Sequence, residues 1–435
     1  MDILVIGSGP TGLTVGAALA RRGHGVTTVD RDPGPEAGGA WRRRGVMQFA
    51  HAHNFRPQVS WLLQSEWPAA YDTWRSLGPE VTDLGELGLP GDPVIVHSRR
   101  VTYERALRIA APDVSGLAQR VGHVDRLLEE RGRVVGAVVD GIRREADLVV
   151  DASGRASRLS GSIDTLGGEC GMAYVDRSYR LHPGAEPGPV SNVIGWFGGF
   201  DGYQVLVFPQ ERGCFSVVLI RPTADAALKR LRHRDAFEAA CRAIPALAAW
   251  TDPQRSRPEG DVLVGGALRN VYRRQRRVPG LVALGDAVST TTPTAGRGVA
   301  MASMQIDALL ALLDAGAEPE TIAEPFGAWC DEQIQPWVAD HIANDDLAVE
   351  RWQGAELDLS RPLTSGAICG AAEVDPRIHQ HCGPFRSMTA LPDSLAPAEP
   401  WARAVYDSGW RPAYSEGPTR DELVAVVDRA LAAAA

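Results

Sequence analysis

A glycine-rich run near the start of the chain has the residue types and spacing that bind a nucleotide phosphate. It follows the apolar residues 3–6 and precedes a helical pattern. In such a strand–turn–helix unit the glycines allow a tight turn, a close approach of backbone to a pyrophosphate, and close packing of helix on strand, while the helix N-terminus faces the phosphate charge. The pattern predicts a dinucleotide site. Its expected cofactor-binding residues are Gly7, Gly9, Pro10, Thr11 and Gly12.

An acidic residue supports this site and narrows the choice of nucleotide. A second apolar strand over residues 26–29 ends at Asp30, which is followed by Arg31. A carboxylate about 20 residues beyond the glycines accepts hydrogen bonds from a ribose hydroxyl. The same charge repels a 2′-phosphate, so we expect Asp30 and Arg31 to lie at FAD or NAD and not at NADP.

Two further runs complete the set of candidate site residues. In the middle of the chain, Asp151 is followed by Gly154 and Arg155. Later, the apolar residues 281–284 lead into a Gly-Asp pair and a Pro-x-x-Gly-x-Gly loop, after which a helical pattern runs to about residue 314. The candidates in this last run are Gly285, Asp286, Pro293, Gly296, Arg297, Gly298 and Val299.

With these three runs in this order, the chain resembles the FAD-dependent, aromatic-hydroxylase-like flavoprotein monooxygenases over roughly residues 1–315. The resemblance implies that Asp286 bonds the ribityl chain of FAD and that Asp151 belongs to the cofactor site. It also implies that Pro293, Gly296, Arg297 and Gly298 assist catalysis beside the pyrimidine end of the flavin. A helix N-terminus there offers N–H donors and partial positive charge to a reduced flavin.

A finer resemblance covers residues 44–53. This stretch is similar to one in bacterial polyether epoxidases, although Met47 stands where they have proline. By this analogy Arg44 and Gln48 line the FAD, and Arg105 reaches its phosphates.

The family's chemistry implies a C4a-hydroperoxyflavin, formed from O2, that hydroxylates or epoxidises a hydrophobic small molecule, and we expect the reaction to belong to bacterial secondary metabolism. The protein then has to position the substrate and exclude water. An aromatic, alternating stretch between residues 170 and 222 is the expected substrate sheet. The candidate substrate residues are Trp196, Phe208, Phe215 and His53.

The source of electrons and the exact reaction stay open at this point. NAD(P)H supplies the electrons directly or through a separate flavin reductase, and the spacing of Asp151 from Gly154 favours the reductase. One alternative is a flavin-dependent reductase of isolated double bonds, since the geranylgeranyl reductases share the Asp-x-x-Gly-Arg form. A non-catalytic FAD-binding protein is the other. Halogenation is disfavoured because related halogenases need a lysine soon after the first βαβ unit, and the single lysine is Lys229.

Composition limits the partners. The 435 residues are 44% apolar and 23% charged with a net charge of −9, which argues against a nucleic-acid surface. No apolar run is long enough to span a membrane, and six scattered cysteines indicate a reducing compartment, so we expect a cytoplasmic protein. His51 and His53 have no convincing third ligand nearby, so no metal is expected.

The expected fold class is α/β: a doubly wound, Rossmann-like FAD domain with an inserted antiparallel sheet domain and a helical C-terminal region. The predicted boundaries are 1–165 and 255–315 for the FAD domain, 166–254 for the sheet and 316–435 for the helices. Hairpins are expected at residues 134–150, around Asp140-Gly141, and at 203–220. A capping box at Thr419 and Glu422 predicts a last helix from 419 to 434.

Overall fold

A parallel five-stranded sheet holds the N-terminal half of the protein together. The computed structural model describes residues 1–36, 41–43, 45–85, 93–266 and 268–434. The sheet has the order β17-β9-β1-β2-β5. These strands are β1 (Asp2–Ile6), β2 (Gly25–Asp30), β5 (Leu117–Val121), β9 (Leu148–Asp151) and β17 (Leu281–Ala283).

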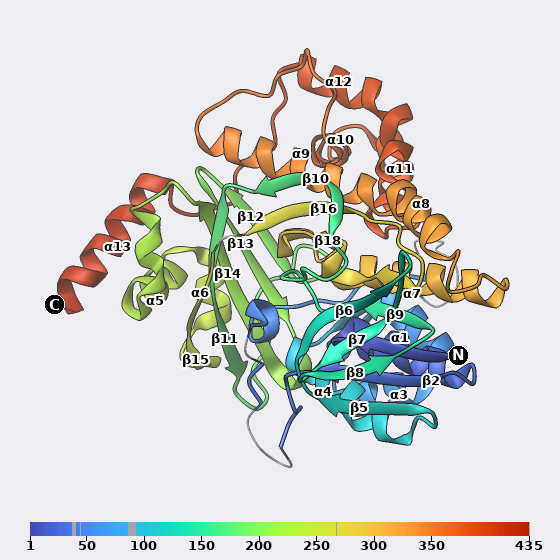
Figure 1. Cartoon of the computed structure of the whole chain (residues 1–435). Helices are drawn as coiled ribbons and strands as arrows, with labels where there is room; N and C mark the ends of the chain where they lie inside the picture. Colours follow the sequence, from blue (N-terminus) through green and yellow to red (C-terminus); the bar gives the residue numbers. More distant parts are fainter. Residues whose placement is uncertain (37–40, 44, 86–92, 267, 435) are drawn as a thin grey trace.

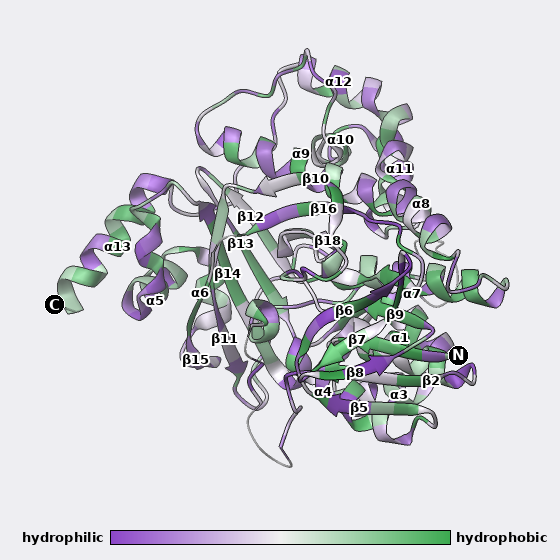
Figure 2. Cartoon of the chain, viewed as in Figure 1, coloured by the Kyte–Doolittle hydropathy of each residue, from purple (hydrophilic) through white to green (hydrophobic). Residues whose placement is uncertain are grey.

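The two faces of this sheet are buried under different layers. Side chains alternate along a strand, so Ile3 and Val5 face one side and Leu4 and Ile6 the other. The first side packs against α1 (Pro10–Arg21) and α7 (Gly298–Asp314). The second is covered by the antiparallel strands β6 (Val124–Glu130), β7 (Arg133–Val139) and β8 (Ile142–Glu145). Figure 2 shows hydrophobic colouring within this sheet, whereas its edge strand β5 is partly hydrophilic.

A second sheet, fully antiparallel, lies beside the first unit (Figure 1). Its order is β12-β13-β14-β11-β15. One of its faces packs against α5 (Arg234–Ala243), α6 (Pro245–Thr251) and the C-terminal helix α13 (Arg420–Ala434). Its strands are β11 (Met172–Leu181), β12 (Trp196–Phe200), β13 (Tyr203–Pro209), β14 (Cys214–Pro222) and β15 (Ser256–Gly265).

The remaining elements join and cover these two sheets. Strands β10 (Ser162–Glu169), β16 (Arg269–Gln275) and β18 (Ser289–Thr290) form a small antiparallel sheet. Figure 1 shows the C-terminal helices, in orange and red, lying across it. They are α8 (Ala323–Gln333), α9 (Gln335–Trp352), α10 (Ser365–Ala371), α11 (His379–Arg386) and α12 (Glu399–Asp407). Near the N-terminus lie α2 (Pro57–Glu66), α3 (Pro68–Ser76), β3 (Glu80–Asp83), β4 (Val94–His97) and α4 (Arg100–Ala110).

The predicted α/β fold class is confirmed, with one error in the strand pairing. The hairpin around Asp140-Gly141 pairs β7 with β8, whereas residues 148–151 were expected to be its second strand. Those residues form β9 and pair in parallel with β1 and β17. An all-apolar strand gains more in the centre of a sheet that is buried on both faces.

The structure also suggests new boundaries for the domains. β15 belongs to the antiparallel sheet, and α13 packs on α5 of the same unit. We therefore propose that the inserted unit extends to Gly265 and includes α13. All six cysteines are free and buried. None of the described helices is long and apolar enough to cross a membrane.

Candidate cofactor and substrate site

A cavity of about 1410 Å³ lies where the two sheets and the C-terminal helices meet. Its walls come from residues 47–57, from the loop 286–299, from the antiparallel sheet and from α11. A pocket for one drug-sized ligand is roughly 300–1,000 Å³. The cavity therefore has room for a flavin ring together with a second small molecule.

The glycine loop is positioned next to the second motif. Gly7 has φ +107°, and a Cβ on Gly12 would lie 1.9 Å from the Gly7 carbonyl oxygen, so only glycine allows α1 to begin this close to β1. Pro10 is the first residue of α1. A Cβ on Gly285 would lie 2.8 Å from Oγ1 of Thr11. The two motifs, far apart in the sequence, are thus in contact.

Asp30 lies at the glycine loop, as expected, but its carboxylate already has protein partners. It accepts the Ser8 N–H at 2.7 Å and pairs with Arg43 at 2.8 Å. Arg43 is also bound to Glu104 at 2.7 Å, and its Nη1 lies 3.2 Å from the position of a Cβ on Gly9. Arg43 therefore sits where a pyrophosphate would approach.

The other basic residues expected at this end are placed less directly. Arg44 lies outside the described residues. Arg31 is exposed beyond β2, and Arg105 lies on α4. On the same helix, Arg108 donates to the Ser8 carbonyl at 3.1 Å. Sequence reasoning missed Glu104 and Arg108. The basic spacing of α4 could have indicated the arginine, but nothing local indicates a buried Glu104.

Several backbone and side-chain groups fit a bound FAD. A Cβ on Gly298 would meet no atom within 4 Å, so the start of α7 is open to the cavity. The first backbone bond of α7 runs from the Met301 N–H to Arg297, which leaves the N–H groups of Gly298 and Val299 free to bind a negative charge. Thr291, in the same wall, has a buried hydroxyl without a partner among the described residues.

Asp286 lines the cavity together with this loop. Burial raises the pKa of its carboxyl, while Arg100, Arg155 and Arg273 act in the opposite direction. Arg273 donates to the Asp286 carbonyl at 3.0 Å and so fixes the turn after β17. Asp286, Gly298 and Val299 are thus the residues that could hold the ribityl chain and the ring.

Asp151 does not share this position. Its carboxylate is fully buried and accepts the N–H and Oγ of Ser153 and the Oγ of Ser157. It therefore holds the loop after β9 in shape. A Cβ on Gly7 would lie 2.4 Å from the Ala152 carbonyl oxygen, so this loop packs directly against the glycine loop.

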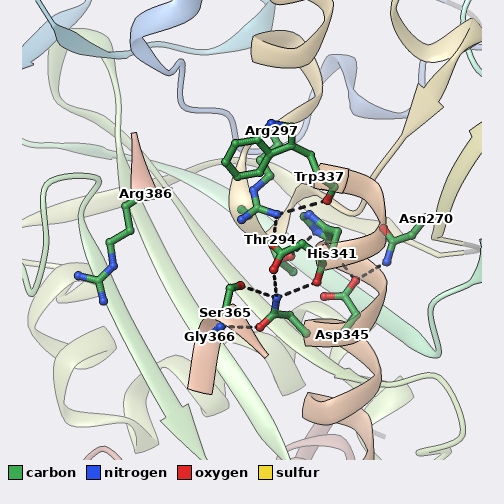
Figure 3. Close-up of polar contacts among 12 residues, drawn as sticks. Asn270, Thr294, Arg297, Trp337, His341, Asp345, Ser365, Gly366 and Arg386 are labelled. Carbon is green, nitrogen blue, oxygen red and sulfur yellow. Dashed lines mark hydrogen bonds and ion pairs between the residues drawn. The ribbon is translucent and has the colours of Figure 1, made fainter. Parts of the chain in front are cut away.

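Arg297 also differs from its expected role at the flavin. Its guanidinium pairs with Asp340 of α9 at 2.6 Å, and both side chains are buried. Its Cζ lies 4.9 Å from the ring centre of Trp337 (Figure 3). Arg297 thus anchors the loop of Pro293 and Gly296 to α9, although it still borders the cavity.

A second buried cluster supports the same loop from α9 (Figure 3). The Thr292 hydroxyl donates to Asp345 at 2.9 Å and lies 2.7 Å from Nε2 of His341, while Asn270 donates to Asp345 at 2.8 Å. Because the hydroxyl hydrogen goes to Asp345, Nε2 of His341 is the donor to Thr292. Sequence reasoning missed this cluster, although His341 and Asp345 have the i, i+4 spacing of one helix face.

The candidate substrate residues divide between the two faces of the antiparallel sheet. Phe208 faces the cavity, as does Phe197, which pairs with Leu206. Phe215 is fully buried on the opposite face and stacks on Tyr179 at 5.3 Å, and Trp196 packs on that same side. The structure therefore does not bring Phe215 and Trp196 to the cavity.

His53 and Gln48 line the cavity, whereas His51 does not. His53 lines the cavity, and burial together with Arg100 lowers its pKa to about 3, so it is neutral. His51 is bound instead to Asp176 of β11. Gln48 lines the cavity and accepts a hydrogen bond from Tyr174 at 3.2 Å. Among the described residues no group of three or more potential ligands could hold a metal ion.

Known proteins are similar to this chain in two respects. The sequence of the N-terminal part matches a family, and the fold of nearly the whole chain matches solved structures. Residues 2–129 match the FAD dependent oxidoreductase family. The solved structure of the flavin-dependent brominase Bmp2 covers 94% of this chain and 100% of its own, with a TM-score of 0.66 at 15% identity. The N-terminal part of the chain is thus similar to FAD dependent oxidoreductases, and the chain as a whole has the fold of flavin-dependent brominases and oxygenases.

Two other similarities concern oxygenases. The 6-methylpretetramide 4-monooxygenase of Streptomyces rimosus is 28% identical to this chain over 376 residues, which are 75% of this chain and 78% of the relative. The structure of 2-methyl-3-hydroxypyridine-5-carboxylic acid oxygenase covers 80% of this chain and 92% of its own, with a TM-score of 0.57 at 17% identity. Two further relatives are 36% and 35% identical over short stretches, and this chain spans only 15% and 17% of their length.

Proposed function

We propose that this protein is an FAD-dependent monooxygenase that hydroxylates or epoxidises a small molecule with an apolar body. The observation that supports this proposal is the set of residues that line the cavity. Its lining includes Asp286 and the open N-terminus of α7, together with Phe208 and Phe197 of the antiparallel sheet. A flavin held by Asp286 and the start of α7 would share this cavity with a substrate bound to the two phenylalanines. The relative from Streptomyces rimosus, itself a monooxygenase, supports this assignment.

The protein's own groups would do three things in this reaction. The N–H groups of Gly298 and Val299 would stabilise negative charge on the pyrimidine end of the flavin. The apolar side chains would hold the substrate and exclude water. Bound FAD would supply the redox chemistry, which is the activation of O2 and the transfer of one oxygen atom to an electron-rich carbon.

The electrons are proposed to come from NAD(P)H, either directly or through a separate flavin reductase. The overall reaction then balances: one oxygen atom enters the substrate, the other leaves as water, and NAD(P)H is oxidised. Halogenation lacks support in this chain. Its one lysine, Lys229, lies on the 3₁₀ turn Leu228–Arg232 and not among the residues that line the cavity.

An isotope experiment tests the proposal. The FAD-loaded protein is reduced without oxygen, mixed rapidly with ¹⁸O2 and candidate apolar substrates, and followed by absorbance and by mass spectrometry of the products. We expect a transient near-ultraviolet species and one ¹⁸O atom in the product. Hydrogenated product without ¹⁸O would replace the proposal with reduction of double bonds. FAD that is retained but never reduced by any donor would indicate a non-catalytic protein.

A further inference from the structure

Two of the six cysteines lie next to each other where α10 packs against α11. The thiol of Cys369, on α10, is hydrogen-bonded to the thiol of Cys382, on α11. Both residues are buried in the same hydrophobic core cluster, and both thiols are free in this structure. Two thiols in direct contact are the arrangement from which a disulfide can form.

A second contact holds the two helices together at the same place. Arg386 lies four residues after Cys382 and donates a hydrogen bond to the Cys369 carbonyl at 3.3 Å. Residues four apart lie on one face of a helix, so Cys382 and Arg386 share the face of α11 that meets Cys369. The contact between the two thiols therefore follows from the packing of the helices.

The two thiols differ in their surroundings. Cys382 is one of the residues that line the cavity, whereas Cys369 is not. The hydrogen bond from the Cys369 thiol and the charge of Arg386 lower the pKa of Cys382, although burial acts in the opposite direction. The same hydrogen bond, together with burial, raises the pKa of Cys369. Cys382 is therefore the better nucleophile, because the thiolate is the form that reacts.

The other four cysteines lack this combination. In the part of the chain that the structure describes, each of them is buried and none lines the cavity. Burial raises the pKa of all four, which keeps them as unreactive thiols. They are Cys170, Cys214, Cys241 and Cys330.

We propose that Cys382 and Cys369 are a reversible redox site, at which hydrogen peroxide in the cavity oxidises Cys382 and Cys369 then closes a disulfide. In the first step the Cys382 thiolate attacks a peroxide oxygen: an S–O bond forms, the O–O bond breaks, and the departing hydroxide takes up a proton to become water. In the second step the Cys369 sulfur attacks the Cys382 sulfur: an S–S bond forms, and the sulfenic oxygen leaves with two protons as a second water. Two thiols thus lose two electrons to one peroxide.

The disulfide would alter one wall of the cavity. It joins α10 to α11, and α11 contributes His379, Cys382, Gly383 and Arg386 to the cavity lining. Peroxide can enter from solvent. A second source, its release when reduced flavin meets O2 without a substrate, rests on the proposed function. Disulfides that form in reducing compartments are usually transient and often sense redox state, which suits a bond that is absent here.

Peroxide treatment of the FAD-loaded, oxidised protein tests the proposal. The treated protein is denatured in N-ethylmaleimide, and its peptides are mapped by mass spectrometry. We expect the loss of two of the six free thiols, a peptide pair linked through Cys369 and Cys382, and recovery of both thiols with dithiothreitol. Cys382 should react at least about tenfold faster than Cys241, whose pKa is raised by burial.

Single variants assign the order of the two steps. In Cys369→Ser, oxidation should stop at the sulfenic acid of Cys382, which dimedone traps. In Cys382→Ser, neither a disulfide nor a dimedone adduct on Cys369 should form. Cys170→Ser is the matched control, because the Cys170 thiol donates to the Met172 carbonyl at 3.9 Å and a serine hydroxyl can do the same. It should still lose two thiols.

Three outcomes would overturn the proposal. These are survival of all six thiols while FAD stays bound, a disulfide that links any other pair of cysteines, or a dimedone adduct on Cys369 with none on Cys382. The peroxide is added and no substrate is oxygenated, so failure of the oxygenase proposal appears separately, in the ¹⁸O experiment.

Discussion

Arg297 and Asp340 form an ion pair in which both side chains are less than a tenth exposed. Each residue therefore neutralises the buried charge of the other. We predict that Arg297→Gln lowers the free energy of unfolding by about 3 kcal/mol, because it leaves the Asp340 charge buried alone. Urea denaturation measures this loss. Arg361→Gln, which breaks an exposed pair, should cost less than about 1 kcal/mol. Equal losses in the two variants would mean that solvent already screens Asp340.

A second residue makes stability depend on pH. Burial raises the pKa of Asp345 from 3.8 to about 6. The folded state therefore favours the protonated acid: the stability it contributes is complete below about pH 3.8 and is lost as the pH rises through 6. We predict that Asp345→Asn, which cannot ionise, gains roughly 2 kcal/mol over the natural protein between pH 4 and pH 8. Denaturation at several pH values checks this, and parallel curves for the two proteins would contradict it.

At the scale of elements, the unit formed by β1, the glycine loop and α1 has no room for a side chain. A Cβ on Gly12 would lie 1.9 Å from the Gly7 carbonyl oxygen, so Gly12→Ala must move the start of α1. We predict at least a tenfold loss of FAD affinity, which corresponds to a displacement costing only about 1.4 kcal/mol. Titration of FAD-free protein measures it. Gly168→Ala is the control, because its Cβ meets nothing within 4 Å, and a similar loss there would rule out the steric explanation.

Elements whose signals are local could be predicted from the sequence. The pairing of β13 with β14, the helix α7 and the capping box of Thr419 and Glu422 are confirmed. β8 was missed because its polar residues lack an apolar alternation. Only the pairing with neighbouring strands reveals it.

The residues of the candidate site also fall into those that local sequence signals predict and those that only the folded structure reveals. The glycine loop and the loop after β17 have their own sequence signatures, and the structure brings them together. The wall on which Phe208 or Phe215 lies depends on strand register, which a single sequence does not determine. The partner of Arg297 comes from α9, and no local pattern connects a loop to a helix so much later in the chain.

At the scale of the whole molecule, the antiparallel sheet separates two regions with different tasks. One face borders the cavity, and the other carries α5 and α13. Cofactor binding should therefore be independent of the packing of the C-terminal helix, although both depend on the same strands.

Leu423 of α13 tests this separation, because its side chain is fully buried against the outer face of the sheet unit. We predict that Leu423→Ala lowers the free energy of unfolding by about 3 kcal/mol through the cavity that it leaves. Its affinity for FAD should stay within about twofold, a change of less than 1 kcal/mol. Denaturation and FAD titration of the same preparation give both values. If FAD affinity instead fell in proportion to stability, the sheet would transmit strain between its faces, and α13 would have to be counted among the elements that shape the cavity.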